Sequence, residues 1–407
     1  MPTETRSDAL RFLLAGDADV VPEDGLAEKL ALGRPLRVKL GLDPTAPAVT
    51  LGWAVVLRKL RQFQDLGHRA VLIVGDFTAR VGDPSGRSET RPRLEAGVVR
   101  AYAERLLEQF WLILDREQTE VRYNAEWLEA LDMETVLRLT ASSTVARMLE
   151  RDDFRRRYEE GRPISVMEFL YPLLQGYDSV AVRADVELGG TDQRFNLLVG
   201  RDVQRAWGQE PQVALTMPLL VGTDGVQKMS QSLGNYIGIT EPPEEMYGKL
   251  VRIPDQLIPD YRLLCLDFFR HPEEAERVRA GLASGALRPW AEKRRLAREV
   301  VDLYHGPGAG AEAERRFDLV HREREVPEKV EERELPAEWG RDGRYWLPRV
   351  LWGLGLASSK SEAQRLIRQG GVRVDGEPVT DAEREFERRE LVGRVLQVGR
   401  RRFVRLT

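Results

Sequence analysis

The sequence predicts an α/β protein in which a doubly wound parallel sheet is followed by a helical domain and a small α+β domain. Three observations lead to this prediction. Apolar runs of strand length alternate with amphipathic helical runs through residues 1–244. Charged helical patterns without a convincing strand occupy residues 245–335. Two short helical patterns, a turn and a pair of strands fill residues 341–407.

Strands of the first domain are expected where short apolar runs occur, at residues 36–42, at residues 70–77 and within residues 213–222. Between the first two runs, apolar residues at helical spacing predict a helix that starts near Trp53 and ends at Gly67. Strands separated by helices pair in parallel, and such sheets bind ligands at the carboxyl ends of their strands. We therefore expect a site in the loops that follow these strands.

A second helix is predicted in the run TDQRFNLLVGRDVQRAW, with Thr191 or Asp192 as its N-cap. Further along the chain, residues 322–340 are rich in charge and proline, which indicates a linker. The helical patterns at about residues 120–160 interrupt the alternation of strands and helices. They are predicted to form an insertion in the sheet domain.

The composition limits the class of protein. The chain has 407 residues, of which 42% are hydrophobic and 31% are charged, as is typical of a soluble globular protein. No apolar run approaches the roughly 18–20 residues of a membrane span, and the N-terminal sequence MPTETRSDAL lacks a signal-peptide core. The single cysteine, Cys265, excludes an internal disulfide and a multi-cysteine metal site. We expect a cytoplasmic protein with no membrane contact.

Charge is distributed unevenly along the chain. Residues 341–407 contain 15 Lys and Arg against 9 Asp and Glu, a net charge of +6, whereas the whole chain carries −4. A basic segment on an acidic body indicates a contact with nucleic acid. A solvated charged surface is the alternative that charge alone leaves open.

Four motifs together carry a family resemblance. They are the loop from Asp43 to Trp53, GDFTARVGDPSGRSETR at residues 75–91, YPLLQGYDSVAVRADVELGGTDQRFN at residues 171–196, and KMSQSLGN at residues 228–235. In this order and spacing they resemble bacterial tyrosyl-tRNA synthetases, which are class I aminoacyl-tRNA synthetases, over nearly the whole chain. The resemblance implies a Rossmann-like catalytic domain, a helical domain for the anticodon region of tRNA, and an S4-like RNA-binding domain. It also implies an enzyme that activates tyrosine with ATP and transfers it to tRNA(Tyr).

The resemblance implies a tyrosine pocket as well. Asp178 would accept a hydrogen bond from the substrate phenol, while Asp83, Tyr171 and Gln175 would hold the substrate ammonium group. Apart from any family, Tyr171, Gln175 and Asp178 follow one another at spacings of four and three, which places them on one face of a helix. Polar residues on an inward face are costly unless they bind something, although a buried polar network without a ligand is the alternative. The further residues expected around tyrosine are Lys39 and Gln193.

Adenylation joins two anionic partners, so the site must position them and neutralise the charge that builds on the phosphates. The N-terminus of the helix that begins near Gly52 would favour an anion. Gly52 would also let adenine lie against the backbone, because a Cβ would intrude there, although a plain turn glycine is the alternative. Mg²⁺ is expected to arrive with ATP rather than in a cage of protein ligands. The other residues expected to contact ATP are Gly41, Asp43, Thr45, Gly190, Asp192 and Lys228.

The chain departs from the family pattern where phosphate is handled. The family has His-x-Gly-His where this chain has Thr50 and Trp53, and its mobile loop has a second lysine where this chain has Gln231. Loss of one preorganised donor typically costs about 2.7–4 kcal/mol of transition-state stabilisation, so we expect slow adenylation with intact tyrosine recognition. The catalytic set implied by these two loops is Thr50, Trp53, Lys228, Gln231 and Ser232.

Other positions near these loops also differ from the family or add charge. Ala48 stands where the family usually has a polar or acidic residue, and Arg80 is an added cation close to the pocket. Arg87 and Arg91 are further cations that could reach phosphate. Because the changes gather at the phosphate side, two alternatives to a tyrosine–tRNA ligase stay open. One is a paralogue that binds tyrosine or an adenylate with weak or altered catalysis, and the other is a purely RNA-binding protein.

Two kinds of macromolecular partner are expected. The tail would bind RNA through shape and phosphate, with a solvated helix face as the alternative; its candidate residues are Lys360, Arg365, Arg368 and Arg373. The insertion would form the interface of a homodimer, unless its helices pack only on their own subunit. The apolar residues expected there are Leu128, Leu131, Val145, Met148 and Leu149.

Overall fold

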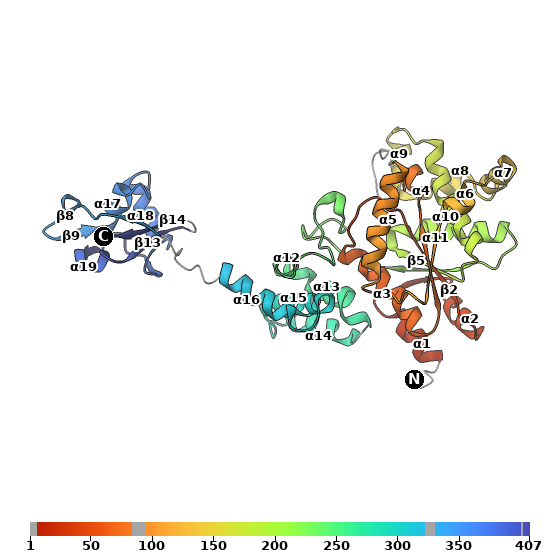
Figure 1. Ribbon diagram of the computed structural model, residues 1–407, viewed down its shortest axis with the longest axis horizontal. Helices are drawn as coiled ribbons and strands as arrows, with labels where there is room; N and C mark the ends of the chain where they lie inside the picture. Colours follow the sequence, from red (N-terminus) through yellow and green to blue (C-terminus); the bar gives the residue numbers. More distant parts are fainter. Residues whose placement is uncertain (1–5, 84–94, 270, 322–329, 400–401) are drawn as a thin grey trace. The chain divides into compact units, whose positions relative to one another are not determined.

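The chain divides into two compact units, Met1–Phe317 and Asp318–Thr407, each with its own hydrophobic core (Figure 1). The computed structural model describes residues 6–83, 95–269, 271–321, 330–399 and 402–407.

A six-stranded sheet forms the centre of the first unit. Its strand order is β1 (Asp19–Val21), β6 (Val213–Met217), β5 (Val186–Gly190), β2 (Arg37–Leu42), β3 (Arg69–Val74) and β4 (Thr119–Tyr123). All neighbours pair in parallel except β1 and β6, which are antiparallel. The three predicted strands are β2, β3 and β6, and the predicted doubly wound parallel sheet is confirmed, with an antiparallel strand at one edge.

Residues of the central strands alternate between two covered faces. On β3, Leu72 joins the core that contains α3 (Leu51–Asp65), whereas Val71 packs with Val182 on the opposite face. Val182 ends α10 (Val166–Val182), which packs along α11 (Arg194–Ala206). A sheet covered on both faces explains why its strands are almost continuously apolar.

Helix α3 corresponds to the helix predicted from Trp53 to Gly67. It begins earlier, at Leu51, because the hydroxyl oxygen of Thr50 caps it by accepting a hydrogen bond from the Trp53 N–H at 3.2 Å. It ends at Asp65, and Gly67 then takes a φ of +83°, a conformation that glycine adopts readily. The last residue of helix α5 (Ala96–Phe110; Figure 1) meets the start of α3, where the rings of Phe110 and Trp53 stack.

The start of the second predicted helix was placed wrongly. Residues Thr191–Gln193 form a short 3₁₀ turn, and α11 begins at Arg194 with Gln193 as its N-cap. Neither Thr191 nor Asp192 caps α11. The Asp192 carboxylate instead pairs with Lys228, whose ammonium lies 2.6 Å away. The side chain that the sequence pattern assigned to a helix cap therefore belongs to the site.

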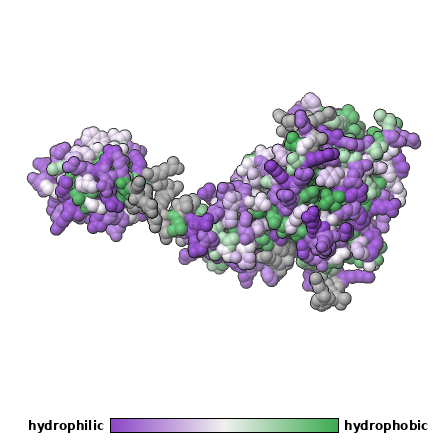
Figure 2. Space-filling view, viewed as in Figure 1, coloured by the Kyte–Doolittle hydropathy of each residue, from purple (hydrophilic) through white to green (hydrophobic). Residues whose placement is uncertain are grey.

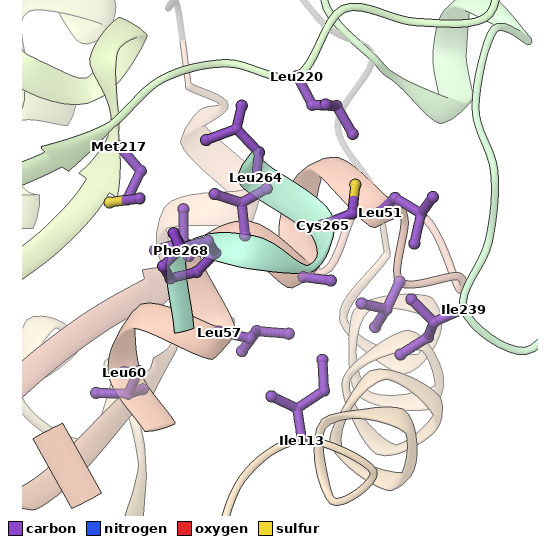
Figure 3. Packing of buried hydrophobic residues seen from close by; sticks show 14 of the residues in the cluster. Leu51, Leu57, Leu60, Ile113, Met217, Leu220, Ile239, Leu264, Cys265 and Phe268 are labelled. Carbon is purple, nitrogen blue, oxygen red and sulfur yellow. The ribbon is translucent and has the colours of Figure 1, made fainter. Parts of the chain in front are cut away.

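The insertion and the helical segment complete the first unit. Four short helices fill the insertion, namely α6 (Ala125–Leu128), α7 (Met133–Ala141), α8 (Val145–Met148) and α9 (Asp152–Glu159). The other helices of this unit are α1 (Arg6–Leu14), α2 (Gly25–Ala31), α4 (Thr78–Val81), α12 (Pro243–Leu250), α13 (Ile258–Cys265), α14 (Pro272–Ala283) and α15 (Pro289–His305), with α16 (Ala309–His321) extending across the boundary. In Figure 3, Leu264 and Cys265 of α13 lie close to Leu57 of α3, so the helical segment shares the core of the sheet.

The second unit contains two small sheets and three helices among its described residues. The five-stranded sheet has the order β11 (Glu377–Val379), β10 (Val372–Val374), β13 (Val395–Val398), β14 (Arg402–Leu406) and β7 (Glu331–Arg333). The three-stranded sheet has the order β12 (Glu385–Glu387), β9 (Arg344–Trp346) and β8 (Gly340–Arg341). The helices are α17 (Leu347–Gly353), α18 (Lys360–Arg368) and α19 (Arg388–Leu391). The predicted pair of helices and pair of strands are α17, α18, β10 and β11.

The predicted linker is partly wrong. Residues 322–329 lie outside the described residues, but β7 pairs in parallel with β14 and belongs to the terminal domain. The prediction that residues 245–335 contain no strand is wrong for the same reason. All three residues of β7 are exposed, so this edge strand forms through backbone pairing and leaves no apolar alternation in the sequence.

Among the residues that the structure describes, no helix is long and apolar enough to cross a membrane. The face of the molecule drawn in Figure 2 is mainly hydrophilic over both units.

Candidate active site

Polar residues gather at the carboxyl edge of the parallel sheet, where a ligand site was expected. Asp43 follows β2, Thr78 follows β3, Asn124 follows β4, and Gln193 lies just after β5. Helix α10 adds Tyr171, Gln175 and Asp178 from one face, as predicted. Its start is fixed by a capping box in which the Ser165 and Glu168 side chains bind the first backbone N–H groups.

Asp178 lies at the buried end of this cluster. The indole Nε1 of Trp127 donates to its Oδ1 at 2.8 Å, and the Asn124 amide donates to its Oδ2 at 3.3 Å. Burial raises the pKa of Asp178 to about 6, although the charge of Lys39 and these two donors oppose the rise. At neutral pH the site therefore presents a carboxylate that is held in place and ready to accept a hydrogen bond from a ligand.

Tyr171 and Asp43 form a second buried contact. The Tyr171 hydroxyl donates to Asp43 Oδ2 at 2.9 Å, and the Thr78 hydroxyl donates to Asp43 Oδ1 at 2.7 Å. Burial raises the pKa of Tyr171 well above its usual value, so its phenol remains a donor. The structure thus links one residue expected at tyrosine with one expected at ATP.

A chain of amide side chains lines the cluster between these points. Gln193 donates to Asp83 Oδ2 at 2.9 Å, and Asn196 donates to Gln193 Oε1 at 3.0 Å and to Gln175 Oε1 at 3.1 Å. Gln175 in turn donates to Glu187 Oε1 at 3.1 Å. The amide oxygens of Gln175 and Gln193 thus both face Asn196, and their amide nitrogens each face a carboxylate.

Lys39 lies beneath α10 and is completely buried. Its ammonium is 2.9 Å from Glu187 Oε1, and it donates to the Ser179 hydroxyl at 2.7 Å and to the Gln175 carbonyl at 2.9 Å. All these partners belong to the protein. Lys39, one of the residues expected around tyrosine, thus joins α10 to β5 beneath the cluster.

At the start of α3, where contacts with phosphate were expected, the chain has no histidine. The Thr50 side chain is buried and caps α3, and the Trp53 ring stacks on Phe110 of α5 with 6.3 Å between centroids. Trp53 remains 38% exposed. Both substituted residues are thus committed to packing or capping, and neither brings a cation to this end of the helix.

Gln231 joins the loop of residues 228–235 to the loop that precedes α3. Its Nε2 donates to the Ala48 carbonyl at 2.5 Å, and the Ala48 N–H donates back to Oε1 at 3.3 Å. Gln109 binds the neighbouring backbone in the same manner, through Pro47 and Val49. We call the reciprocal pair between Gln231 and Ala48 the amide clasp. Both of its residues are among the positions at which these loops depart from the family pattern.

Lys228 and Asp192, which were both expected to contact ATP, form an ion pair with 2.6 Å between the ammonium and the carboxylate. Ser232 shares a hydrogen bond with Ser230, with 2.9 Å between the hydroxyl oxygens. The backbone N–H of Thr45 donates to the Asp43 carbonyl at 2.8 Å and shapes the turn after β2. Lys228 is thus the cation that these loops place at the edge of the site.

The glycines of the site differ in how much space surrounds the position that a Cβ atom would take. A Cβ on Gly41 would contact nothing within 4 Å, and one on Gly52 would lie 3.5 Å from its nearest neighbour, Met229. A Cβ on Gly190 would lie 2.7 Å from Leu219. The Leu219 atom is the end of a flexible side chain that is 37% exposed, so a Cβ at position 190 needs a shift of that side chain, whereas Gly41 and Gly52 leave room for a Cβ without any shift.

The added arginines do not join the described site. Arg80 forms an ion pair with Glu129 at 2.6 Å and lies over the Phe77 ring. Arg87 and Arg91 lie outside the described residues. In the described structure the guanidinium of Arg80 is committed to a protein carboxylate rather than to the phosphate side.

Sequence reasoning missed four residues that hold the pocket together, namely Asn124, Trp127, Glu187 and Asn196. Asn124 and Trp127 directly follow β4, so they reach the same sheet edge as the predicted residues. The short run TEVRY has one aliphatic residue and two charged ones, and all five of its residues are only partly buried, so it does not form an apolar run like those of the predicted strands. Recognition of β4 would have placed NAEW beside Asp178.

This arrangement is that of a class I aminoacyl-tRNA synthetase. The family "tRNA synthetases class I (W and Y)" matches residues 31–321, and the S4 domain matches residues 346–390. The tyrosine–tRNA ligase of Moorella thermoacetica is 56% identical, over 98% of this chain and 95% of its own length. That of Thermotoga maritima is 48% identical, over 99% of this chain and 98% of its own length. The chain belongs to the tyrosyl-tRNA synthetase family.

A solved structure agrees with the fold. The crystal structure of tyrosyl-tRNA synthetase complexed with L-tyrosine from Archaeoglobus fulgidus matches with a TM-score of 0.60 at 24% identity. The match covers 77% of this chain and 100% of that chain.

Proposed function

We propose that this protein is a tyrosine–tRNA ligase, which activates tyrosine with ATP and transfers the tyrosyl group to tRNA(Tyr). The observation that carries the proposal is the buried carboxylate of Asp178, held by Trp127 and Asn124 in a chain that is 48–56% identical to tyrosine–tRNA ligases. A buried acceptor that awaits a hydroxyl penalises a ligand without one, because the acceptor is then left unpaired. Asp178 would thus select tyrosine over phenylalanine.

In the proposed reaction a carboxylate oxygen of tyrosine attacks the α-phosphorus of ATP, and the bond to pyrophosphate breaks. Asp83, Tyr171 and Gln175 would hold the substrate ammonium, and Gln193 would support Asp83 through their hydrogen bond. Asp192 would bind the ribose and Lys228 the phosphates. Gly41 and Gly52 would leave space for the nucleotide. A hydroxyl of the terminal tRNA ribose then attacks the activated carbonyl, and AMP leaves.

Mg²⁺ would enter the site on the phosphates of ATP, since this hydrated ion usually binds substrate oxygens and few protein ligands. Within the described ranges, no group of three or more His, Cys, Asp or Glu side chains is placed to hold a metal ion. When bound, the ion would neutralise phosphate charge.

The phosphate side would limit the rate of adenylation. Thr50, Trp53 and Gln231 are neutral and are occupied by a helix cap, a ring stack and the amide clasp. Tyrosine recognition uses other side chains and would be unaffected. We therefore expect a slow first step with normal tyrosine affinity.

Tyrosine-dependent exchange between ATP and pyrophosphate tests the proposal, with phenylalanine as the control amino acid. We expect exchange above the blank with tyrosine and none with phenylalanine. We also expect the protein to charge tRNA(Tyr). Exchange equal to the blank at high enzyme concentration would contradict it. Retained tyrosine binding in that case would identify a paralogue with altered chemistry.

A homodimer is also proposed, with the insertion as its interface. Of the apolar residues expected there, Leu128 and Met148 are buried within their own unit, whereas Val145 is 63% exposed. Met133 and Leu137 of α7 are exposed as well. These three exposed side chains on α7 and α8 support an interface, because large apolar side chains gathered on a surface favour a partner.

The S4 domain would bind the tRNA partner through its basic helix. Lys360, Arg365 and Arg368 lie on α18, and Arg373 lies on β10, where it donates to the Gly376 carbonyl at 3.0 Å. Arg365 and Arg368 form only exposed ion pairs, which contribute little and are exchanged readily for phosphate. We place this ligase in the cytoplasm, where its tRNA substrate is used.

A further inference from the structure

Helix α17 of the S4 domain carries a tryptophan outside its buried face. Leu347, Val350 and Leu351 are completely buried, whereas Trp352 is 48% exposed. Tryptophan is the largest side chain and is highly buried on average, so half an indole in solvent is a feature that packing does not explain. Exposed aromatic rings of this kind are common where a protein binds a ligand.

A cation lies over one face of this ring. The ammonium of Lys360 is 5.1 Å from the centroid of the Trp352 ring. Lys360 is the first residue of α18, a nine-residue helix capped by the Ser359 hydroxyl, which accepts from the Glu362 N–H at 3.1 Å. The partial positive charge at this helix start adds to that of the ammonium. An aromatic plane and a positive charge therefore occur side by side.

Helix α17, which carries Trp352, is held in one orientation within its domain. The next residue, Gly353, lies so close to Trp339 that a Cβ there would be 2.6 Å from that ring. One turn earlier, Arg349 donates to the Glu338 carbonyl at 3.0 Å. These contacts fix the rotation of α17 and so the direction in which Trp352 leaves the helix. A rigid aromatic residue binds with a small loss of conformational entropy.

We propose that Trp352 and Lys360 form a stacking site for an unpaired RNA base, with the adjoining phosphate bound by Lys360. The site rests on the proposed function for its RNA partner. Proteins recognise single-stranded RNA by stacking unpaired bases on aromatic side chains, and a cation beside the ring holds the backbone. The base would stack on the ring face opposite Lys360 or displace the ammonium toward the phosphate. Because every base has a flat face, the site tolerates different sequences.

The test measures binding of the full chain to an unmodified tRNA(Tyr) transcript over a series of salt concentrations. Trp352→Ala should weaken binding about 5- to 100-fold with an unchanged salt slope, because the change removes stacking and no charge. Trp352→Phe should retain most of the affinity. Lys360→Gln should weaken binding and lower the salt slope by about one, because it removes a phosphate contact.

Two further measurements separate stacking from a general loss of structure. A fully paired RNA duplex should bind the native chain and Trp352→Ala equally, because it offers no unpaired base in its interior. The fluorescence quenching that tRNA causes should be smaller in Trp352→Phe, because the stacked indole is absent. Thermal unfolding should show that each variant is folded at the assay temperature, and Trp352→Ala and Trp352→Phe should keep native tyrosine-dependent exchange.

Equal tRNA affinity of Trp352→Ala and the native chain would overturn the proposal. An equal loss of affinity on the duplex would also overturn it and would assign Trp352 to backbone contact or to folding. If the native chain shows no exchange with tyrosine and yet the Trp352→Ala effect is present, the ligase proposal fails and the stacking site stands.

Discussion

At the scale of the single residue, the buried carboxylate of Asp178 lowers the free energy of unfolding at neutral pH, although the same charge is proposed to bind tyrosine. Its carboxylate is buried with a pKa of about 6, against an ordinary value of 3.8. Between these two values the folded chain holds a proton that the unfolded chain has released. The contribution of Asp178 to the free energy of unfolding therefore falls as pH rises from about 4 to about 6 and stays low above that range.

Asp178→Asn should change the stability of the unliganded protein little at pH 7.5, because removal of the buried charge is offset by the donor of Trp127 or Asn124 that then faces the new amide NH2 group. The same change should weaken tyrosine binding, because the charged acceptor for the phenol is lost. Urea unfolding at pH 7.5 and tyrosine titration would measure both effects. A variant that is less stable and binds tyrosine normally would show that the carboxylate has no ligand role.

In the native protein, tyrosine affinity should decrease as pH falls below about 6, where Asp178 takes up a proton. Titrations with tyrosine from pH 5 to 8 would follow this decrease, and Asp178→Asn should abolish it. A pH-independent affinity over this range would argue that the phenol binds elsewhere.

The glycines give a second prediction at this scale. Gly52→Ala should leave stability unchanged or raise it by up to about 1 kcal/mol, since a Cβ fits and alanine favours a helix. It should nevertheless raise the KM for ATP and leave the KM for tyrosine unchanged. Gly310→Ala on α16 is the matched control, and it should destabilise the protein because a Cβ there would lie 2.3 Å from the backbone of Arg298. An unchanged KM for ATP in Gly52→Ala would leave Gly52 as a turn residue only.

At the scale of the element, the amide clasp joins the loop before α3 to the loop of residues 228–235. Thr50 both caps α3 and occupies a position where the family has histidine, so structure and chemistry compete for one side chain. Loss of a Thr cap costs about 0.5–2 kcal/mol. A change that restores phosphate chemistry should therefore have a cost in stability.

The double substitution Thr50→His and Trp53→His should raise the adenylation rate by orders of magnitude while tyrosine affinity barely changes. The melting temperature should fall, because the cap and the stack on Phe110 are both lost. Gln231→Lys, made separately, should add a cation and break the amide clasp. Pyrophosphate exchange, tyrosine titration and thermal unfolding provide the three measurements. A double variant that is no faster would show that another group already supplies the missing charge.

The elements also show how far the sequence could be interpreted. Strong apolar runs predicted β2, β3, β6 and α3, because burial on both faces leaves a clear pattern. The exposed β7 and the partly buried β4 contain no such apolar run. For the site, helical spacing predicted the face of α10, but the partners of Lys39 lie on β5 and α10, 136 to 148 residues away. Only the tertiary fold brings those groups together.

At the scale of the whole molecule, the two units have separate cores, and the S4 domain lies entirely in the second. The residues proposed to bind tyrosine all belong to the first unit. We therefore expect recognition of the amino acid and binding of RNA by the S4 domain to be separable along the chain.

Truncation after His321 should therefore keep tyrosine binding and pyrophosphate exchange, while tRNA affinity and its salt dependence decrease. Filter binding at several salt concentrations, beside exchange assays, would measure this separation. Unchanged tRNA affinity after truncation would place the RNA contact on the first unit.

The proposed homodimer gives a further prediction at this scale. Sedimentation at micromolar concentration should show about twice the chain mass of 46.3 kDa. Replacing Leu137 with Glu should shift the mass toward the monomer, because a charge would enter the apolar patch. A single-chain mass for the native protein would contradict the dimer.

The buried pair of Lys39 and Glu187 has a consequence for the evolution of this protein. Removal of one partner of such a pair leaves an uncompensated charge and typically costs about 3–5 kcal/mol, a large share of the roughly 5–15 kcal/mol that holds a domain folded. A lineage could not pass through either single replacement without a compensating change elsewhere, so the two positions should vary together or stay fixed. Selection for another amino acid would meet less resistance at Asp178 and Trp127, where substitution alters the pocket and leaves no unpaired lysine.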